Sequence, residues 1–259
     1  MKRIIQSLKY INIAFVFCWA VYLLSSCDAG QGDAAPGNAQ NGQGGSLARF
    51  TVVNNYLYTV GNEDLSVFDI STPTTPQPGR RIQLDWGVET IFPFQDKLLI
   101  GSTTGVYAFD ISQPANPEYL DRLQHVRRCD PVVAQGKYAY VTLRGGGECG
   151  GASNQLDVID ISDIRNLKLM NSYTMESPYG LGVDGNLLFV CDGSAGLKVL
   201  DNSDPLNLKQ IKQFTNINAY DVIPLNGLLL LIGEDGLFQY RYNNSNSEMT
   251  LISSIPVVR

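Results

Sequence analysis

The sequence predicts an all-β protein, a β-propeller of about five four-stranded blades preceded by a signal peptide and a flexible tether. Three observations carry this prediction. A short pattern centred on an aspartate recurs along the chain, its copies are spaced at about forty residues, and short apolar runs alternate with turn residues inside each copy. The copies of the pattern are 67–71, 108–112, 158–162, 199–203 and a degenerate 239–243.

The spacing of the central residue sets the length of the repeat. It is aspartate in four copies, at Asp69, Asp110, Asp160 and Asp201, and Arg241 in the fifth, so the intervals are 41, 50, 41 and 40 residues. This is the usual length of a propeller blade. The repeats then run 47–85, 86–127, 128–177, 178–218 and 219–259. A closed five-bladed ring is favoured over an open β-solenoid, because closure leaves no exposed strand edges.

Each repeat is expected to hold four strands, which the second repeat shows best. Apolar or alternating runs at 89–94, 98–100, 105–109 and 119–123 are separated by small polar or glycine turns. Between the third and fourth strands, the aspartate is followed two residues later by serine, and both side chains can accept backbone N–H groups. We therefore interpret the repeated aspartates as chain-reversing corners rather than as metal ligands or catalytic groups.

The first 46 residues are predicted to form a targeting signal and a flexible linker rather than part of the folded domain. Lys2, Arg3 and Lys9 precede an apolar run at 11–24, which is the layout of a secretory signal. The segment 24–27, Leu-Ser-Ser-Cys, resembles the lipobox of bacterial lipoproteins, which implies cleavage after residue 26 and acylation of Cys27, with palmitate among the expected lipids. A plain signal peptide or an uncleaved helix anchor is the alternative. Residues 27–46 hold no large apolar side chain and are expected to form a flexible linker.

The charge of the mature chain excludes one class of partner. The whole chain has a net charge of −6, and removal of residues 1–26 leaves 16 basic and 25 acidic residues, a net charge of about −9. Nucleic acid and anionic lipid surfaces attract proteins with a basic footprint. We therefore expect no nucleic-acid partner, and membrane attachment through Cys27 alone.

Three copies of the pattern resemble a named repeat. The segments 65–69, 156–160 and 197–201 read Leu-Ser-Val-Phe-Asp, Leu-Asp-Val-Ile-Asp and Leu-Lys-Val-Leu-Asp. They are similar to the LVIVD repeat of bacterial surface and secreted proteins, and the resemblance extends over about 47–242. It implies a β-propeller and no particular activity. The fifth copy departs from the consensus at Arg241, which leaves the manner of ring closure open.

The third repeat carries a glycine-rich insertion at 143–154 and two cysteines. Gly145 to Gly150 satisfies G-x-G-x-x-G, but the following segment reads as a strand, whereas a phosphate cradle needs a helix. Cysteines of an exported domain are normally oxidised, so a Cys129–Cys149 disulfide is predicted. By closing a loop of about twenty residues, it should stabilise the fold by roughly 3 kcal/mol. Cys191 follows an apolar strand and is interpreted as a buried core thiol.

The residue types give little support for a catalytic site or a metal-binding site. Residues 147–151 fit a nucleophile elbow with cysteine in the serine position, but an elbow needs a following helix and the disulfide would consume the sulfur. His125 is the only histidine, so neither a Cys/His nucleophile nor a histidine-rich metal site can be assembled. No catalytic residue and no resident cofactor are therefore assigned.

One candidate ligand site follows from the ring itself. The start of each blade's first strand should face the axis, which aligns Arg49, Glu89, Asp130, Tyr179 and Asp221. Glu89, Asp130 and Asp221 could bind Ca²⁺; pairing of these carboxylates with Arg49 or with Arg127 and Arg128 is the favoured alternative.

The expected function is recognition at the bacterial cell envelope. A rigid propeller presents variable loops, and such loops are where binding resides. We expect a non-catalytic binding or scaffold module for a protein or glycan partner, lipid-anchored at the outer membrane or cell surface. The alternative is an extracellular carbohydrate hydrolase or lyase that uses channel carboxylates as acid and base.

Overall fold

The structure is a computed structural model that describes residues 44–124, 131–146, 153–245 and 247–257. These residues belong to a compact unit that spans Ala39–Arg259. Within them the regular structure is entirely β-strand, and no helix of a length and apolarity suited to crossing a membrane occurs. The strands are β1 (Phe50–Val53), β2 (Tyr56–Val60), β3 (Asp64–Asp69), β4 (Gln77–Gln83), β5 (Val88–Phe94), β6 (Lys97–Ser102), β7 (Gly105–Asp110), β8 (Glu118–Gln124), β9 (Val132–Gln135), β10 (Tyr138–Leu143), β11 (Gln155–Asp160), β12 (Lys168–Thr174), β13 (Leu181–Asp184), β14 (Leu187–Cys191), β15 (Leu197–Asp201), β16 (Lys209–Phe214), β17 (Ala219–Leu225), β18 (Leu228–Gly233), β19 (Gly236–Tyr242) and β20 (Met249–Pro256).

The strands form five antiparallel four-stranded meanders, as the sequence predicts. We call them blades 1 to 5, and they consist of β1–β4, β5–β8, β9–β12, β13–β16 and β17–β20. In every blade the register shifts by a bulge between the third and fourth strands, as between Val158 and Ile159. Such a bulge increases the local twist and bends the outermost strand.

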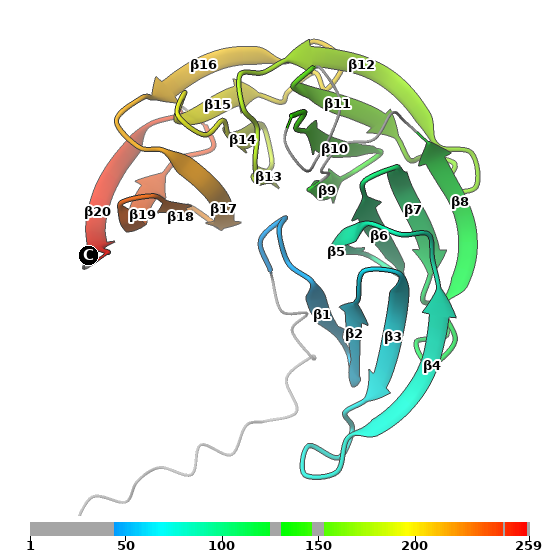
Figure 1. The fold of residues 1–259 in the computed structure, drawn as a ribbon. Helices are drawn as coiled ribbons and strands as arrows, with labels where there is room; N and C mark the ends of the chain where they lie inside the picture. Colours follow the sequence, from blue (N-terminus) through cyan, green and yellow to red (C-terminus); the bar gives the residue numbers. More distant parts are fainter. Residues whose placement is uncertain (1–43, 125–130, 147–152, 246, 258–259) are drawn as a thin grey trace, which may run out of the picture. The chain divides into compact units, whose positions relative to one another are not determined.

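The blades follow one another along an arc, with the first strand of each blade innermost (Figure 1). The innermost strands contact one another in sequence, from β1 to β5, β9, β13 and β17. Among the described residues, close packing joins consecutive blades, and blades 1 and 5 stand at the two ends of the arc (Figure 1). The closed ring expected from the repeats is therefore open between blades 5 and 1.

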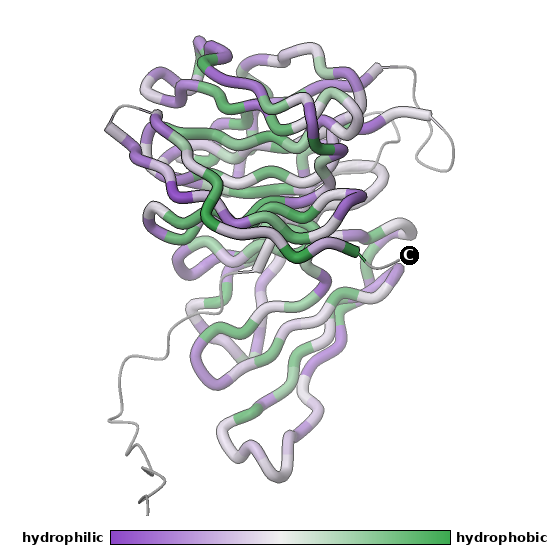
Figure 2. Tube along the Cα trace, turned by 90° about the vertical axis from the view of Figure 1, so that its left-hand side faces the viewer, coloured by the Kyte–Doolittle hydropathy of each residue, from purple (hydrophilic) through white to green (hydrophobic). Residues whose placement is uncertain are grey.

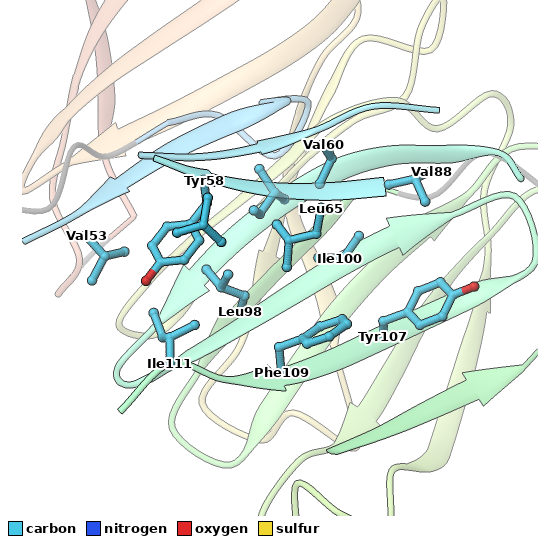
Figure 3. Packing of buried hydrophobic residues seen from close by; sticks show 12 residues of the cluster. Val53, Tyr58, Val60, Leu65, Val88, Leu98, Ile100, Tyr107, Phe109 and Ile111 are labelled. Carbon is cyan, nitrogen blue, oxygen red and sulfur yellow. The ribbon is translucent and has the colours of Figure 1, made fainter. Parts of the chain in front are cut away.

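The hydrophobic core is divided among the four interfaces between consecutive blades. Figure 3 shows the first of them, where Tyr58, Val60 and Leu65 of blade 1 meet Leu98 and Phe109 of blade 2. The other face of blade 2 packs on blade 3 through alternate residues such as Leu99 and Ala108. A middle blade is thus apolar on both faces, which explains its nearly continuous apolar strands.

The repeated aspartates form the predicted corners. Asp69, Asp110, Asp160 and Asp201 each accept the backbone N–H of the serine two residues later, at 2.7 to 2.9 Å. The hydrogen bonds from Ser112 lower the pKa of Asp110 to about 2. In the fifth copy, where Arg241 replaces aspartate, Asn243 accepts the N–H of Ser245 at 2.8 Å instead. The corner is therefore kept but displaced by two residues.

Tyrosine hydroxyls tie neighbouring blades together. Tyr58 in β2 donates to the carbonyl oxygen of Pro114, in the corner of blade 2, at 2.8 Å. Tyr140 in β10 donates to Asn202 Oδ1 of blade 4 at 2.6 Å, and both side chains are buried. Asn202 stands where the first three copies of the pattern have isoleucine. The fourth copy departs from the consensus because this position accepts a hydrogen bond from the preceding blade.

The Tyr140 hydroxyl provides a direct test of this tie. Tyr140→Phe leaves Asn202 Oδ1 buried without this donor, so the free energy of unfolding should fall by about 1 to 2 kcal/mol. Chemical denaturation measures it. Tyr56→Phe, at a half-buried position in β2, is the matched control and should change stability by less than about 0.5 kcal/mol. Equal losses in the two variants would contradict the role of the buried hydrogen bond.

Candidate functional site

One end of the strands gathers the residues with the most distinctive chemistry. In an antiparallel meander, the connection from one blade to the next and the turn between its second and third strands lie at the same end. This end therefore carries the segments 84–87, 175–180 and 215–218, the turns 103–104 and 192–196, and residues 144–146 and 153–154 between β10 and β11. We call it the loop face. Residues 147–152 of the glycine-rich insertion lie outside the described residues.

The chain reaches the loop face through residues 44–49, which we call the N-terminal arm. Ser46 is only 1% exposed, although it was expected in the flexible tether. Its hydroxyl accepts the N–H of Leu181 in blade 4 at 2.7 Å and donates to Asp221 Oδ1 in blade 5 at 3.1 Å. The carbonyl oxygen of Ala48 accepts the N–H of Ile91 in blade 2 at 2.9 Å. The arm thus bonds to three blades besides the one it enters.

Asp221 is the anchor of the N-terminal arm. Its carboxylate accepts the N–H groups of Ser46, Leu47 and Val222 and the Ser46 hydroxyl. Burial nevertheless raises the pKa of Asp221 to about 6. A Cβ on Gly45 or Gly180 would lie 2.2 or 2.1 Å from a carboxylate oxygen, so both positions require glycine for the carboxylate to approach.

The strand register corrects the predicted axial column. When positions are counted from the corner residue of each blade, Ile232 of blade 5 corresponds to Gly101 of blade 2. Asp221 pairs with Ile232, and Thr90 pairs with Gly101. Arg49 and Asp221 therefore occupy the same strand position as Thr90. This position is offset by one residue from that of Glu89 and Tyr179. A one-residue offset turns a side chain to the other face of a strand. The predicted column is thus not a single level ring.

A small cavity beside the innermost strands is lined by apolar side chains together with Ser46. This cavity of about 160 Å³ lies between the N-terminal arm and the innermost strands of blades 2 to 5. Its lining includes Phe92, Val133, Leu181, Val183 and Val222. Among the described residues, no group of three or more His, Cys, Asp or Glu side chains could hold a metal ion. Asp130 lies outside these residues, so Ca²⁺ binding with Glu89 and Asp221 stays a prediction.

A buried ion pair fixes the connection between blades 3 and 4. The side chain of Asp192 is fully buried, and its Oδ2 lies 2.6 Å from Lys198 Nζ. The same carboxylate accepts the N–H of Ser177 at 2.7 Å and that of Glu176 at 3.1 Å. A buried carboxylate with these partners has its charge compensated. It holds in place the loop that carries Tyr179.

Beside this loop lies a cluster formed by Arg144, Tyr179 and Tyr220, which we call the arginine–tyrosine cluster. The guanidinium carbon of Arg144 lies 3.9 Å from the centre of the Tyr179 ring. The rings of Tyr179 and Tyr220 are 5.4 Å apart and inclined by 52°. All three side chains are half-buried. A flat aromatic surface next to a guanidinium can stack on a planar or sugar ligand and offer a positive charge.

A second cationic and aromatic group lies on blade 2. Arg122 stacks over the Tyr107 ring at 4.6 Å and pairs with the Asp85 carboxylate. Trp86 follows Asp85 and is 52% exposed. The loop face therefore presents an exposed tryptophan in addition to the arginine–tyrosine cluster. The sequence analysis singled out Tyr179. It missed that Arg144 and Tyr220 both contact Tyr179, because the three residues come from different repeats.

Of the predicted cysteine sites, the structure describes only Cys191. Cys27, Cys129, Cys149 and His125 lie outside the described residues, so the lipid anchor and the disulfide stay predictions. Cys191 is free and buried, as its interpretation as a core thiol requires. Burial, with the nearby Asp221 and Asp192 carboxylates, raises its pKa well above the ordinary value. This thiol is therefore protonated and unreactive.

Five antiparallel meanders around a common centre define the class as a β-propeller protein. The profile of the LVIVD repeat matches residues 44–78, 127–175 and 180–215. The chain therefore contains LVIVD repeats on a β-propeller fold, which confirms the resemblance read from 65–69, 156–160 and 197–201. A search of curated protein sequences finds no match.

Solved structures with a similar fold share little sequence with this chain. A protein from Lactobacillus plantarum is 13% identical, with a TM-score of 0.63 over 77% of this chain and 67% of its own. BamB from Moraxella catarrhalis is 9% identical, with a TM-score of 0.58 over 77% and 58%. The periplasmic gluconolactonase PpgL of Pseudomonas aeruginosa is 13% identical, with a TM-score of 0.58 over 79% and 68%. The chain thus spans about two thirds or less of these proteins, and the likeness shows the fold alone.

The raised pKa of Asp221 gives a pH-dependent stability. The folded protein binds this proton more tightly than the unfolded chain, whose carboxyl pKa is about 4. Its contribution to stability is therefore complete below about pH 4 and is lost as the pH rises through about 6. Relative to Asp221→Asn, the wild type should lose about 2 kcal/mol of unfolding free energy between pH 4.5 and 7.5.

Denaturant unfolding at several pH values measures this difference. Asp201→Asn is the matched control, because hydrogen bonds from Ser203 lower the pKa of Asp201 and place its titration below this range. A wild-type curve parallel to that of Asp221→Asn would contradict the burial of the Asp221 carboxylate.

Proposed function

We propose that the protein is a lipid-anchored binding module of the bacterial cell envelope, whose loop face recognises a protein or glycan partner. The observation that carries the proposal is the arginine–tyrosine cluster. It combines two neighbouring aromatic rings with a guanidinium on a rigid frame. The predicted signal, lipobox and tether support a position outside the cytoplasm, and a BamB protein is among those with a similar fold.

The buried carboxylates near the axis favour binding over catalysis. Asp192 is paired with Lys198 and accepts two backbone N–H groups. Asp221 accepts four hydrogen bonds from the N-terminal arm and its own strand. A general base or nucleophile needs a carboxylate that can reach the substrate, and both of these are occupied. Hydrolysis of a carbohydrate or of a sugar lactone remains the second candidate, supported by the likeness to a periplasmic gluconolactonase.

Trp86 supplies an internal probe for ligands of the loop face. It is the only tryptophan left after removal of residues 1–26. Titration with uronate-containing oligosaccharides and with acidic peptides should change its fluorescence in a saturable manner. Arg144→Ala or Tyr179→Ala should weaken the same ligand at least about tenfold, since a desolvated cation–π contact is worth over 1 kcal/mol.

Two controls make the binding test decisive. Arg241→Ala removes an exposed arginine of blade 5 and should leave the affinity unchanged. Incubation of the wild type with gluconolactone or with the bound oligosaccharide should give no turnover above the spontaneous rate. Equal affinity in Arg144→Ala and wild type would refute recognition by the cluster, and turnover abolished by Asp192→Asn or Asp221→Asn would establish the hydrolase.

The proposed anchor has its own test. The full chain expressed in a bacterium should incorporate an alkyne analogue of palmitate and sediment with the membranes. Cys27→Ser should lose the label and keep its first 26 residues, because acylation precedes cleavage at a lipobox. Cys18→Ser, within the apolar run, is the matched control and should be labelled like the wild type. Undiminished labelling of Cys27→Ser would exclude the lipobox.

A further inference from the structure

Polar side chains hold the loops of the loop face to one another. The strands are mostly hydrophobic, whereas the turns that join them are mostly hydrophilic (Figure 2). A contact between two loops therefore depends on a donor or an acceptor in the right place. Asn154 is such a side chain. It is half-buried and lies directly before β11, at the point where the glycine-rich insertion of the third repeat ends.

The amide of Asn154 contacts both parts of the chain that carry the arginine–tyrosine cluster. Its Oδ1 accepts the N–H of Gly145, the residue after Arg144, at 2.8 Å. Its Nδ2 donates to the carbonyl oxygen of Glu176, in the segment that leads to Tyr179. One side chain of blade 3 therefore joins the backbone beside the guanidinium to the backbone that leads to the ring.

These two bonds require an amide at position 154. The N–H of Gly145 is a donor and the carbonyl oxygen of Glu176 is an acceptor, so the side chain must accept at one atom and donate at the other. An ionised aspartate only accepts, and alanine does neither. The other blades hold no amide at this position. Counted from the corner residue, the counterparts of Asn154 are Glu63, Thr104, Ala195 and Asp235.

The segment that carries Tyr179 is also held by two other side chains. Asp192 in blade 4 accepts the N–H of Glu176 at 3.1 Å. The hydroxyl of Thr142 in blade 3, which is fully buried, donates to the carbonyl oxygen of Tyr179 at 2.5 Å. Neither of these bonds reaches the chain that follows β10. The part of Asn154 is therefore to fix that chain and the Tyr179 segment relative to each other.

We propose that Asn154 is a positioning residue of the arginine–tyrosine cluster, which holds the guanidinium of Arg144 over the ring of Tyr179. The guanidinium carbon lies 3.9 Å from the ring centre. An arginine side chain has several rotatable bonds, so this stacking persists only if the two backbones keep their relative positions. The effect of Asn154 on binding rests on the proposed function of the cluster, because a ligand that meets a preformed site does not have to order it. The stacking itself exists without a ligand.

Nuclear magnetic resonance of the full chain in detergent micelles, labelled at arginine, tests the positioning without a ligand. The ring current of Tyr179 shields protons above the ring, so the side-chain protons of Arg144 should resonate upfield in the wild type and lose this shift in Tyr179→Leu. Asn154→Ala should lose most of the upfield shift. At neutral pH Asn154→Asp should lose it as well, because the carboxylate still accepts from Gly145 but cannot donate to Glu176.

Asn171→Ala is the matched control. Asn171 Nδ2 donates to the carbonyl oxygen of Leu206 at 3.0 Å, so this amide also joins blade 3 to blade 4, but at the outer strands. Its removal should leave the Arg144 resonances unchanged. Circular dichroism reports the folding of each variant, and Asn154→Asp decides if Asn154→Ala does not fold. A wild type without the upfield shift, a shift retained in both Asn154 variants, or an equal loss in Asn171→Ala would overturn the proposal.

Affinity measurements separate the role of Asn154 from the proposed function. Calorimetric titration with a uronate-containing oligosaccharide should show about tenfold weaker binding in Asn154→Ala, as in Arg144→Ala. The double variant should bind less than about twofold more weakly than Arg144→Ala alone, because the two residues act through one contact. Additive losses would overturn the positioning role. A wild type that does not bind the oligosaccharide would count against glycan recognition, and the Arg144 resonances would still decide the role of Asn154.

Discussion

The packing of one sheet face on the next is the interaction on which the whole structure depends. No blade could bury its apolar side chains alone, because a single four-stranded sheet leaves both faces in water. Blade 2 shows the consequence, since Leu98 packs toward blade 1 and Leu99 toward blade 3. Every other feature follows this requirement. The corners return the chain from the third to the fourth strand of each blade, and the tyrosine ties link neighbouring blades.

The sequence was sufficient for the repeat and its corners because both are local. An aspartate that accepts the N–H of a serine two residues later forms the same turn wherever it occurs. Strand register in the terminal blades was harder to predict. By the register of the corner residues, Tyr58 of blade 1 corresponds to Leu99 of blade 2, and Leu57 corresponds to Leu98. Strands that are apolar on both faces lose the two-residue alternation that fixes register.

The candidate site was less accessible to sequence reasoning, because its contacts join distant residues. Ser46 and Asp221 are 175 positions apart, and nothing in the small polar residues around Ser46 announces a buried side chain. Arg144 and Tyr179 come from different repeats, and their stacking depends on a loop that Asp192 holds in place. Departures from the repeat were the best available signal. Asn202 in place of isoleucine marks a hydrogen bond between blades, and Lys198 in the variable position of the consensus marks the partner of Asp192.

The N-terminal arm determines how the domain responds to mechanical load. A pull on the chain ahead of Gly44 does not first peel β1 from β2, one ladder bond at a time. It is carried by Ser46 and its neighbours, whose hydrogen bonds to Leu181 and Asp221 lie in blades 4 and 5, and by Ala48, which is bonded to Ile91 in blade 2. Force is therefore shared among several sheets and applied near the axis, where it loads these bonds together rather than in succession. A domain built in this way resists unfolding from the end at which the N-terminal arm enters it.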